Sequence, residues 1–203
     1  MDNGIALLGT SADPPTRGHQ ALLTGLLGRY EQVGTWASDN PMKSHGAPLA
    51  LRARLLKALV EQIKSPGLTL EQELSSPWAL TTLQRAALHW PMRDLVFVVG
   101  SDLAAQIPSW RKADEFLQLC RLAIAPREGW PLLPGTLRSL EQLGARIELL
   151  DLAVPASASS ELRQAPQQSQ VPSQVWPLLI EHGLYGLCLL YTSDAADEGL
   201  GVD

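Results

Sequence analysis

The chain has 203 residues, of which 45% are hydrophobic and 18% charged, a composition typical of one globular domain and not of a disordered chain. Its formal net charge of −5 does not favour a nucleic-acid-binding protein, and no apolar run approaches the ~20 residues of a membrane span. The N-terminal MDNG lacks the basic residues of a secretory signal, and two cysteines exclude a disulfide framework, so we expect a cytoplasmic protein.

Short β-type runs alternate with helical patterns along the chain. The predicted strands are 4–8, 32–37, 67–70, 94–99, 121–125 and 146–150. The predicted helices are 18–29, 51–63, 79–89, 111–119, 136–143 and 173–182. This alternation with short connections predicts an α/β fold with a doubly wound, mostly parallel sheet, in which ligands bind beyond the carboxyl ends of the strands.

The segment GTSADPPTRGH follows the first predicted strand. Gly9 permits close backbone approach, while Thr10 and Ser11 offer hydroxyl and N–H groups. Gly18 and His19 then open a helix, whose N-terminus attracts anions. His19 at this place can donate a hydrogen bond to a phosphate oxygen and carry positive charge near it. The segment is therefore a candidate phosphate site, although neither of the two commonest nucleotide-binding glycine motifs is present.

The next chemistry-bearing residues lie after the second and fourth predicted strands. Lys43, in NPMKSH, is placed to neutralise a phosphate. Gly100 permits a sharp exit from the fourth strand, and Asp102 is placed to accept hydrogen bonds from ribose hydroxyls. Trp110 offers a flat apolar face to an aromatic ring.

A third candidate site is SASSELR at 157–163. Ser159 and Ser160 precede a short predicted helix and supply an N-cap with free N–H groups. Arg163, one turn later, faces the same anion. Such a site suits the β- and γ-phosphates of ATP.

The last residues of the chain, from about 188 to 203, are expected to lie outside the domain formed by 1–187. They resemble a translated sequencing-library adapter and carry four acids with no Lys or Arg, so removing them changes the net charge from −5 to −1. The alternative is a genuine acidic tail. We expect this segment to be disordered and leave it out of the fold.

The tetrapeptide Thr16-Arg17-Gly18-His19 resembles the first motif of the nucleotidyltransferase superfamily with the (H/T)xGH pattern, a Rossmann-like fold. The longer pattern around it resembles the bacterial nicotinate-nucleotide adenylyltransferases, and GTSADPPT with DNPMKSH is most similar to their cyanobacterial branch. The usual family spelling has Gly, Thr and Phe where this chain has Thr10, Ser11 and Ala12.

Further segments extend this resemblance over about residues 4–186. The Gly100–Trp110 segment is similar to the family's G-x-D…W, whose Trp stacks on the pyridine ring, and SASSELR is similar to I-S-S-T-x-[IL]-R. The resemblance implies that Trp78 and Thr82, in SSPWALTTL, line the nicotinate side, with Ala79 replacing a Thr. It also implies that Arg127, in the family's R-x-G, contacts the mononucleotide.

What the resemblance implies is adenylyl transfer from ATP to nicotinate mononucleotide, giving deamido-NAD and pyrophosphate. His19 and Thr16 would contact the ATP phosphates, Ser159, Ser160 and Arg163 would hold the departing pyrophosphate, and Mg²⁺ would arrive with ATP, because the sequence shows no clustered metal ligands. Three alternatives stay open: nicotinamide mononucleotide as acceptor, pantetheine phosphate as acceptor, and an inactive nucleotide-binding module. Both a monomer and a homo-oligomer fit the sequence.

The remaining histidines and tryptophans are not assigned to the site. We expect His45 to be solvated and His89 and His182 to be structural or surface residues. The packing tryptophans are expected to be Trp36, Trp90, Trp130 and Trp176.

Overall fold

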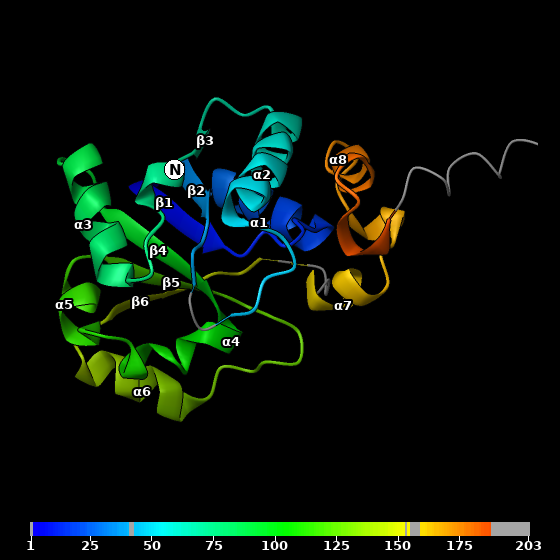
Figure 1. Cartoon of the computed structure of the whole chain (residues 1–203). Helices are drawn as coiled ribbons and strands as arrows, with labels where there is room; N and C mark the ends of the chain where they lie inside the picture. Colours follow the sequence, from blue (N-terminus) through cyan, green and yellow to red (C-terminus); the bar gives the residue numbers. More distant parts are fainter. Residues whose placement is uncertain (1, 41–42, 153, 155–158, 188–203) are drawn as a thin grey trace, which may run out of the picture.

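Six parallel strands form the centre of the computed structural model, which describes residues 2–40, 43–152, 154 and 159–187 (Figure 1). The strands are β1 (Asp2–Thr10), β2 (Tyr30–Ala37), β3 (Leu68–Leu70), β4 (Leu95–Gly100), β5 (Arg121–Ala125) and β6 (Arg146–Leu149). Their order in the sheet is β3-β2-β1-β4-β5-β6, and every described pairing is parallel. The predicted strands and the doubly wound α/β fold are confirmed.

Eight α-helices connect and cover the strands within the described residues. They are α1 (Arg17–Leu27), α2 (Leu49–Ile63), α3 (Ala79–His89), α4 (Ser101–Ala104), α5 (Ala113–Gln118), α6 (Pro134–Gln142), α7 (Ser159–Gln164) and α8 (Trp176–Glu181). The prediction from sequence lacks α4, because one turn of helix is too short to show a period of 3.6 residues. It also starts the last helix too early, since the chain over 173–175 turns before α8 begins.

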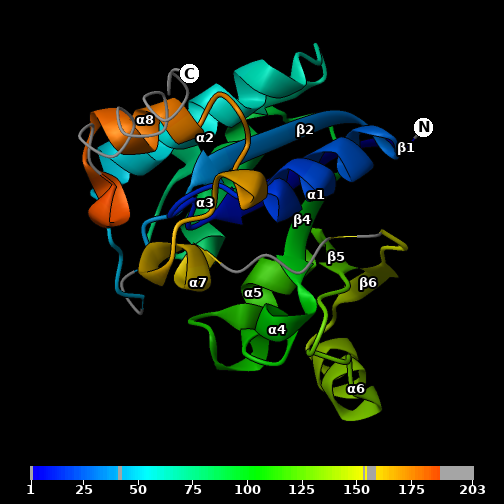
Figure 2. The same cartoon turned by 90° about the vertical axis from the view of Figure 1, so that its right-hand side faces the viewer.

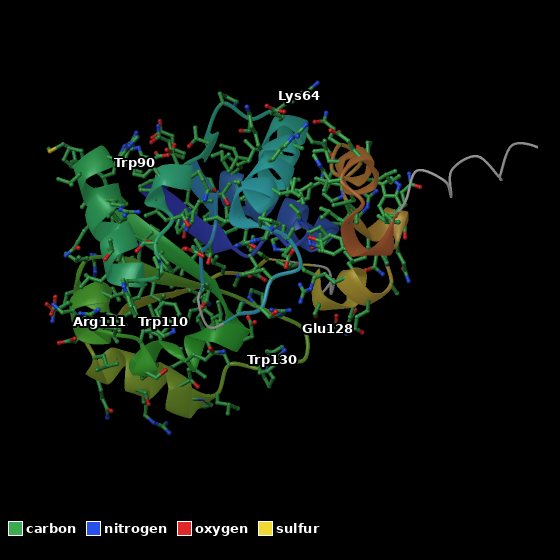
Figure 3. All side chains as sticks on the ribbon, in the orientation of Figure 1. Lys64, Trp90, Trp110, Arg111, Glu128 and Trp130 are labelled. Carbon is green, nitrogen blue, oxygen red and sulfur yellow. The ribbon has the colours of Figure 1, made fainter. Side chains whose placement is uncertain are left out.

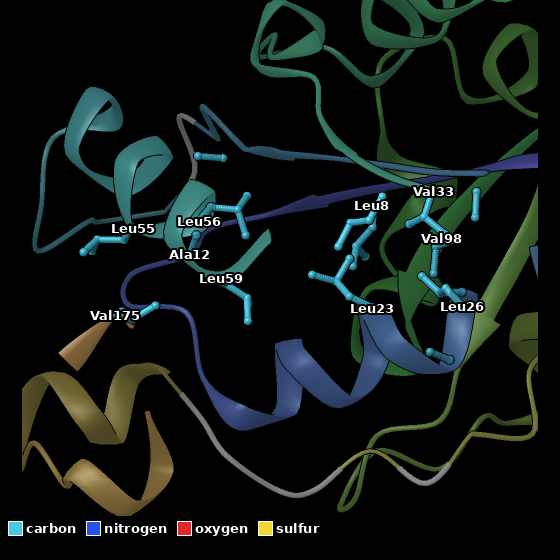
Figure 4. Close-up of a cluster of buried hydrophobic side chains, with 14 of the residues drawn as sticks. Leu8, Ala12, Leu23, Leu26, Val33, Leu55, Leu56, Leu59, Val98 and Val175 are labelled. Atoms are coloured by element: carbon cyan, nitrogen blue, oxygen red, sulfur yellow. The ribbon is translucent and has the colours of Figure 1, made fainter. Parts of the chain in front are cut away.

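The helices cover both faces of the sheet, as the alternation of apolar side chains along the strands requires (Figure 1). Ala6 and Leu8 of β1 belong to a buried cluster that includes side chains of α1, α2, α7 and α8. Ile5 and Leu7, pointing the other way, belong to a second cluster that includes side chains of α3, α4, α5 and α6. Figure 4 shows part of the first core, where Leu23 of α1 approaches Leu8.

The strand order reverses between β1 and β4, where the chain returns from the edge strand β3 to the middle of the sheet. At such a point the loops that leave two neighbouring strands run to opposite faces of the sheet, and a crevice opens between them at the carboxyl edge. The loops after β1, β2, β4 and β5 all begin at this edge and surround the crevice. None of the described helices is long and apolar enough to cross a membrane.

The prediction that residues 188–203 form a separate tail falls outside the described residues. Near the end of the described part, Leu184–Gly186 form a short 3-10 helix that packs beside α7 and α8.

Candidate active site

A cavity of about 610 Å³ opens at the carboxyl edge of β1, β4 and β5. All residues predicted to bind ATP or its phosphates line this cavity, together with Arg127. From the N-terminal half these are Gly9, Thr10, Ser11, Thr16, Gly18, His19 and Lys43. From Gly100 onward they are Gly100, Asp102, Arg127, Ser159, Ser160 and Arg163. The three segments singled out in the sequence thus converge on one space.

His19 and Thr16 form a reciprocal cap at the N-terminus of α1. The Thr16 backbone N–H donates to His19 Nδ1 over 3.0 Å, and the His19 backbone N–H donates to Thr16 Oγ1 over 3.4 Å. Because Nδ1 accepts a hydrogen bond, the proton of the neutral ring resides on Nε2. The cap therefore leaves His19 Nε2 as a hydrogen-bond donor.

The predicted positive charge on His19 is wrong for this structure. Burial, with smaller contributions from the cations of Arg127 and Lys43, lowers the pKa of His19 from 6.5 to about 4. The imidazole is accordingly neutral at pH 7. His19 can act on an anion as a neutral donor, and the cations that line the cavity include Arg127, Lys43 and Arg163.

The conformation of the loop between β1 and α1 depends on Asp13, a residue to which the sequence analysis assigned no role. Its carboxylate is fully buried and accepts from the Tyr185 hydroxyl over 2.6 Å and from the backbone N–H groups of Gly46 and Ala47 over 2.7 and 3.2 Å. Arg163 Nη1 lies 3.5 Å from Asp13 Oδ2 and donates to its carbonyl over 3.0 Å. Asp13 thus ties the loop to three distant parts of the chain.

Arg52 of α2 is a buried cation that joins three loop segments around the cavity. It is 1% exposed, and it donates to the carbonyls of Ser11, Ser38 and Ala47 at 2.7, 2.9 and 3.1 Å. Burial lowers the pKa of Arg52, and the nearby Asp13 opposes this effect. Arg52 looks like any polar residue of an amphipathic helix in sequence, so its role was missed.

His45 is not solvated as expected. Its side chain is 15% exposed, and Nδ1 lies 3.6 Å from Asp13 Oδ2. Burial and the neighbouring Arg52 cation lower the pKa of His45. His45 lines the cavity beside Lys43.

The short helix α7 rests against the loop before α1 (Figure 2). The Ser159 hydroxyl donates to the Pro14 carbonyl over 2.9 Å, so this serine joins α7 to the loop. Ser160 is exposed and also lines the cavity. Arg163 lies one turn later and, through its contacts with Asp13, presents its guanidinium beside the loop.

On the opposite wall, Asp102 and Arg127 form an ion pair. A Cβ at position 100 would overlap Asp102 Oδ1, so a larger residue there would force this carboxylate to shift. Ser101 holds this wall together, because its hydroxyl donates to the Trp130 carbonyl over 2.7 Å and accepts from the Arg127 N–H over 3.0 Å. The loop after β5 is thereby attached to the start of α4.

Trp130 is not a packing residue, contrary to expectation. It is 56% exposed and lines the cavity (Figure 3). Trp36, by contrast, is buried, and a Cβ at Gly9 would lie 2.7 Å from its ring. Gly9 is therefore required for the packing of Trp36 as well as for an open cavity.

Three predicted mononucleotide-binding residues do not line this cavity. Trp78 lines a second cavity of about 210 Å³, together with Arg111 and Lys112. Thr82 is 2% exposed, and its hydroxyl donates to the Leu74 carbonyl over 3.0 Å, so it supports the start of α3. Trp110 packs against Phe116, with ring centroids 5.6 Å apart.

One cluster of metal-ligand types occurs in the described part of the chain, although the sequence showed none. Ligand atoms of Glu71, Glu73 and His89 lie within 4.8 Å of one another, but these residues line neither cavity. Burial and a hydrogen bond with Glu73 raise the pKa of Glu71, which fits two carboxyl groups that share a proton. His89 also packs against Trp90, as a structural residue does.

The parallel sheet with a polar crevice at its switch point defines an α/β protein with a ligand site beyond the carboxyl ends of its strands. The cytidylyltransferase-like family model matches residues 7–173. A Synechocystis protein named "Probable nicotinate-nucleotide adenylyltransferase" is 38% identical over 89% of this chain and 98% of its own length. A Chlorobaculum parvum protein of the same name is 30% identical over 91% and 99%.

A solved structure has the same fold. The Plasmodium falciparum nicotinic acid mononucleotide adenylyltransferase complexed with NaAD superimposes with a TM-score of 0.74 at 17% identity, covering 92% of this chain and 99% of that one. The chain belongs to the cytidylyltransferase-like family and, within it, to the nicotinate-nucleotide adenylyltransferases.

Proposed function

We propose that this protein transfers the adenylyl group of ATP to nicotinate mononucleotide, giving deamido-NAD and pyrophosphate. The observation that carries the proposal is the convergence of His19, Asp102 and Arg163, from three separate segments, on one cavity. The names of its relatives in the family support the same reaction.

The chemistry requires positioning and charge stabilisation more than a reactive side chain. The 5′-phosphate oxygen of the mononucleotide attacks the α-phosphorus of ATP in line, a new P–O bond forms, and the bond to the β-phosphate breaks. No protein nucleophile or general base is needed, because the attacking phosphate is already anionic. Catalysis then comes from donors and cations aimed at the oxygens that gain charge.

The roles of the residues follow from their places in the cavity. His19 donates from Nε2 to an ATP phosphate oxygen, and Thr16 holds the ring in the tautomer that does so. Arg163 and Lys43 balance the charge of the pyrophosphate, and Ser160 lies beside it. Ser159 acts through the loop that it joins to α7. Mg²⁺ enters as part of the MgATP substrate.

The opposite wall is assigned to the sugar and the mononucleotide. Asp102 accepts from ribose hydroxyls and Arg127 contacts the mononucleotide phosphate. The ion pair between them keeps both side chains at the cavity wall before substrate binds. The cytoplasm is the proposed compartment, where the buried Cys120 thiol stays reduced.

The test is pyrophosphate release from MgATP with each of three acceptors: nicotinate mononucleotide, nicotinamide mononucleotide and pantetheine phosphate. We expect release with the nicotinate compound at the highest kcat/KM. Binding of ATP with no release from any acceptor would instead identify an inactive nucleotide-binding module. Faster release with either other acceptor would reassign the substrate.

A further inference from the structure

Tyr185, close to the end of the described chain, acts on the candidate active site from behind its wall. It lies in the 3-10 helix Leu184–Gly186, which follows α8 and contacts α7 (Figure 2). Its hydroxyl donates to Asp13 Oδ1 over 2.6 Å, but Tyr185 itself does not line the cavity. Burial and this hydrogen bond raise the pKa of Tyr185, so the hydroxyl stays protonated and remains a donor at neutral pH.

The backbone at Tyr185 has a conformation that a bulky residue rarely adopts. Its φ of 57° and ψ of 31° lie in the left-handed region, which is unfavourable for a residue with a Cβ. Strain of this kind persists only where surrounding contacts impose it, and it is concentrated at functional sites. The hydrogen bond to Asp13 is a contact that can impose it.

The carboxylate of Asp13 is a buried charge that depends on donors within reach. Oδ1 accepts from Tyr185 and from the Ala47 N–H, and Oδ2 accepts from the Gly46 N–H. A buried carboxylate that loses one donor is strongly destabilised, so another donor moves in where one is near. The arrangement around Asp13 is therefore sensitive to the loss of any one partner.

The nearest cation to this carboxylate is Arg163, which the proposed reaction also uses. Its Nη1 donates to the Asp13 carbonyl over 3.0 Å but lies 3.5 Å from Oδ2, so its ion pair with the carboxylate is loose. The side chain is 29% exposed and lines the cavity. A guanidinium carries five N–H donors, and those that Asp13 does not engage are free to meet a phosphate.

Gly46 brings Tyr185 and Arg163 together on the same stretch of backbone. A Cβ at Gly46 would lie 2.8 Å from Arg163 Cδ and 2.9 Å from Tyr185 Cε1. Both side chains thus pack closely against position 46, where the backbone N–H donates to Asp13. A change at Tyr185 is therefore transmitted to Arg163 directly.

We propose that Tyr185 is a positioning residue for adenylyl transfer, whose hydroxyl occupies Asp13 Oδ1 and so keeps the guanidinium of Arg163 available to the pyrophosphate part of ATP. Without this hydroxyl, Asp13 draws Arg163 into a tight ion pair and away from the cavity. The inference rests on the proposed function and adds a residue that acts through Arg163.

Tyr185→Phe tests the proposal, because it removes the hydroxyl and keeps the ring. We expect the KM for MgATP, and the KM for pyrophosphate in the reverse reaction, to rise about 5- to 20-fold. The KM for nicotinate mononucleotide should change by less than about 2-fold. A merely structural role would instead reduce the active fraction, so kcat would fall with every KM unchanged, and that result overturns the proposal.

A double-mutant cycle shows whether Tyr185 acts through Arg163. In the Arg163→Gln background, Tyr185→Phe should change the KM for pyrophosphate by less than about 2-fold, because the guanidinium that it would displace is already gone. The same rise in both backgrounds overturns the proposal. The matched control is Tyr30→Phe, which removes another buried hydroxyl at the start of β2, outside the cavity, and should leave the KM values unchanged.

Gly46→Ala provides a second variant should Tyr185→Phe fail to fold. Its Cβ displaces the stem of Arg163 while the tyrosine hydroxyl remains, so the KM for pyrophosphate should again rise, and an unchanged KM overturns the proposal. A wild type that releases no pyrophosphate with any acceptor rejects the proposed function instead. The Kd for MgATP, measured by calorimetry in wild type and Tyr185→Phe, then tests the role of Tyr185 separately.

Discussion

The backbone N–H of Thr16 donates to Nδ1 of His19 over 3.0 Å, at the point where the loop after β1 becomes α1. This contact determines the tautomer of His19 and leaves its Nε2 proton for the cavity. Two residues three positions apart in the motif thus have different tasks. Thr16 orients the ring, and His19 is the residue proposed to donate to the anion.

Replacing His19 by Asn separates these two tasks. The Asn side chain can still accept from the Thr16 N–H but is too short to carry a donor to the position of Nε2. We expect kcat/KM to fall about 10²- to 10³-fold, as for other preorganised donors to a developing anion. The free energy of unfolding should change by less than about 1 kcal/mol.

Near-normal turnover of His19→Asn would remove His19 from the reaction. His19→Ala serves as the comparison, because it removes donor and cap together. It should show the same loss of activity with an additional destabilisation of about 1 kcal/mol. Steady-state kinetics and urea unfolding measure both quantities.

The low pKa of His19 makes stability depend on pH. In the folded protein the ring titrates at about 4, whereas the unfolded value is 6.5, so between these values the unfolded chain binds the additional proton. Stability is therefore lost as the pH falls from 6.5 towards 4, by up to about 3 kcal/mol. Urea unfolding at pH 7.5, 6 and 4.5 should show a larger loss for wild type than for His19→Asn, and equal losses would contradict the assignment.

The order of elements was predictable because each strand and each long helix carries its own local pattern of apolar residues. Continuous apolar runs such as DLVFVV mark strands buried on both faces, and β4 does bury Leu95–Val99 between the two cores. The single turn of α4 has no such signal. Its position is set by the exit from β4 at Gly100 and by the hydrogen bonds of Ser101.

The buried Arg52 should matter for stability more than any exposed arginine. Arg52→Met leaves the carbonyls of Ser11 and Ser38 without their donor, and we expect a loss of about 3–5 kcal/mol in the free energy of unfolding. The matched control is Arg54→Met on the same helix, whose exposed pair with Glu181 at 3.5 Å is worth less than about 1 kcal/mol. Similar losses in the two variants would show that Arg52 does not hold the loops together.

Arg163→Gln tests the cation assigned to the pyrophosphate. We expect kcat/KM for ATP to fall about 10- to 100-fold, the range for a lost charge-assisted contact. Arg17→Gln is the control, since Arg17 donates to the Ser169 carbonyl over 2.6 Å and does not line the cavity. If the two variants lose activity equally, the loss of activity comes from disturbed packing around α1 and the loop before it, and not from a lost contact between Arg163 and phosphate.

The candidate site was predictable only in part, because only some of its residues carry a signal in the local sequence. Short motifs identified the residues that face the cavity, such as His19 and Asp102, because their chemistry is visible in their type and spacing. The residues that hold them, Asp13 and Arg52, act through contacts between segments far apart in the chain, and no local pattern reports these. Trp130 was misread because exposure of a tryptophan depends on the loop that carries it, which Ser101 attaches to α4.

The most direct test of adenylyl transfer follows the label of ATP into the products. With MgATP and nicotinate mononucleotide, label on the α-phosphorus should appear in deamido-NAD, and label on the γ-phosphorus should appear only in pyrophosphate. Both products should form in equal amounts. Release of the γ-label as inorganic phosphate, with ADP as the other product, would contradict the account, because it would mean that the bond to the γ-phosphate is the one that breaks.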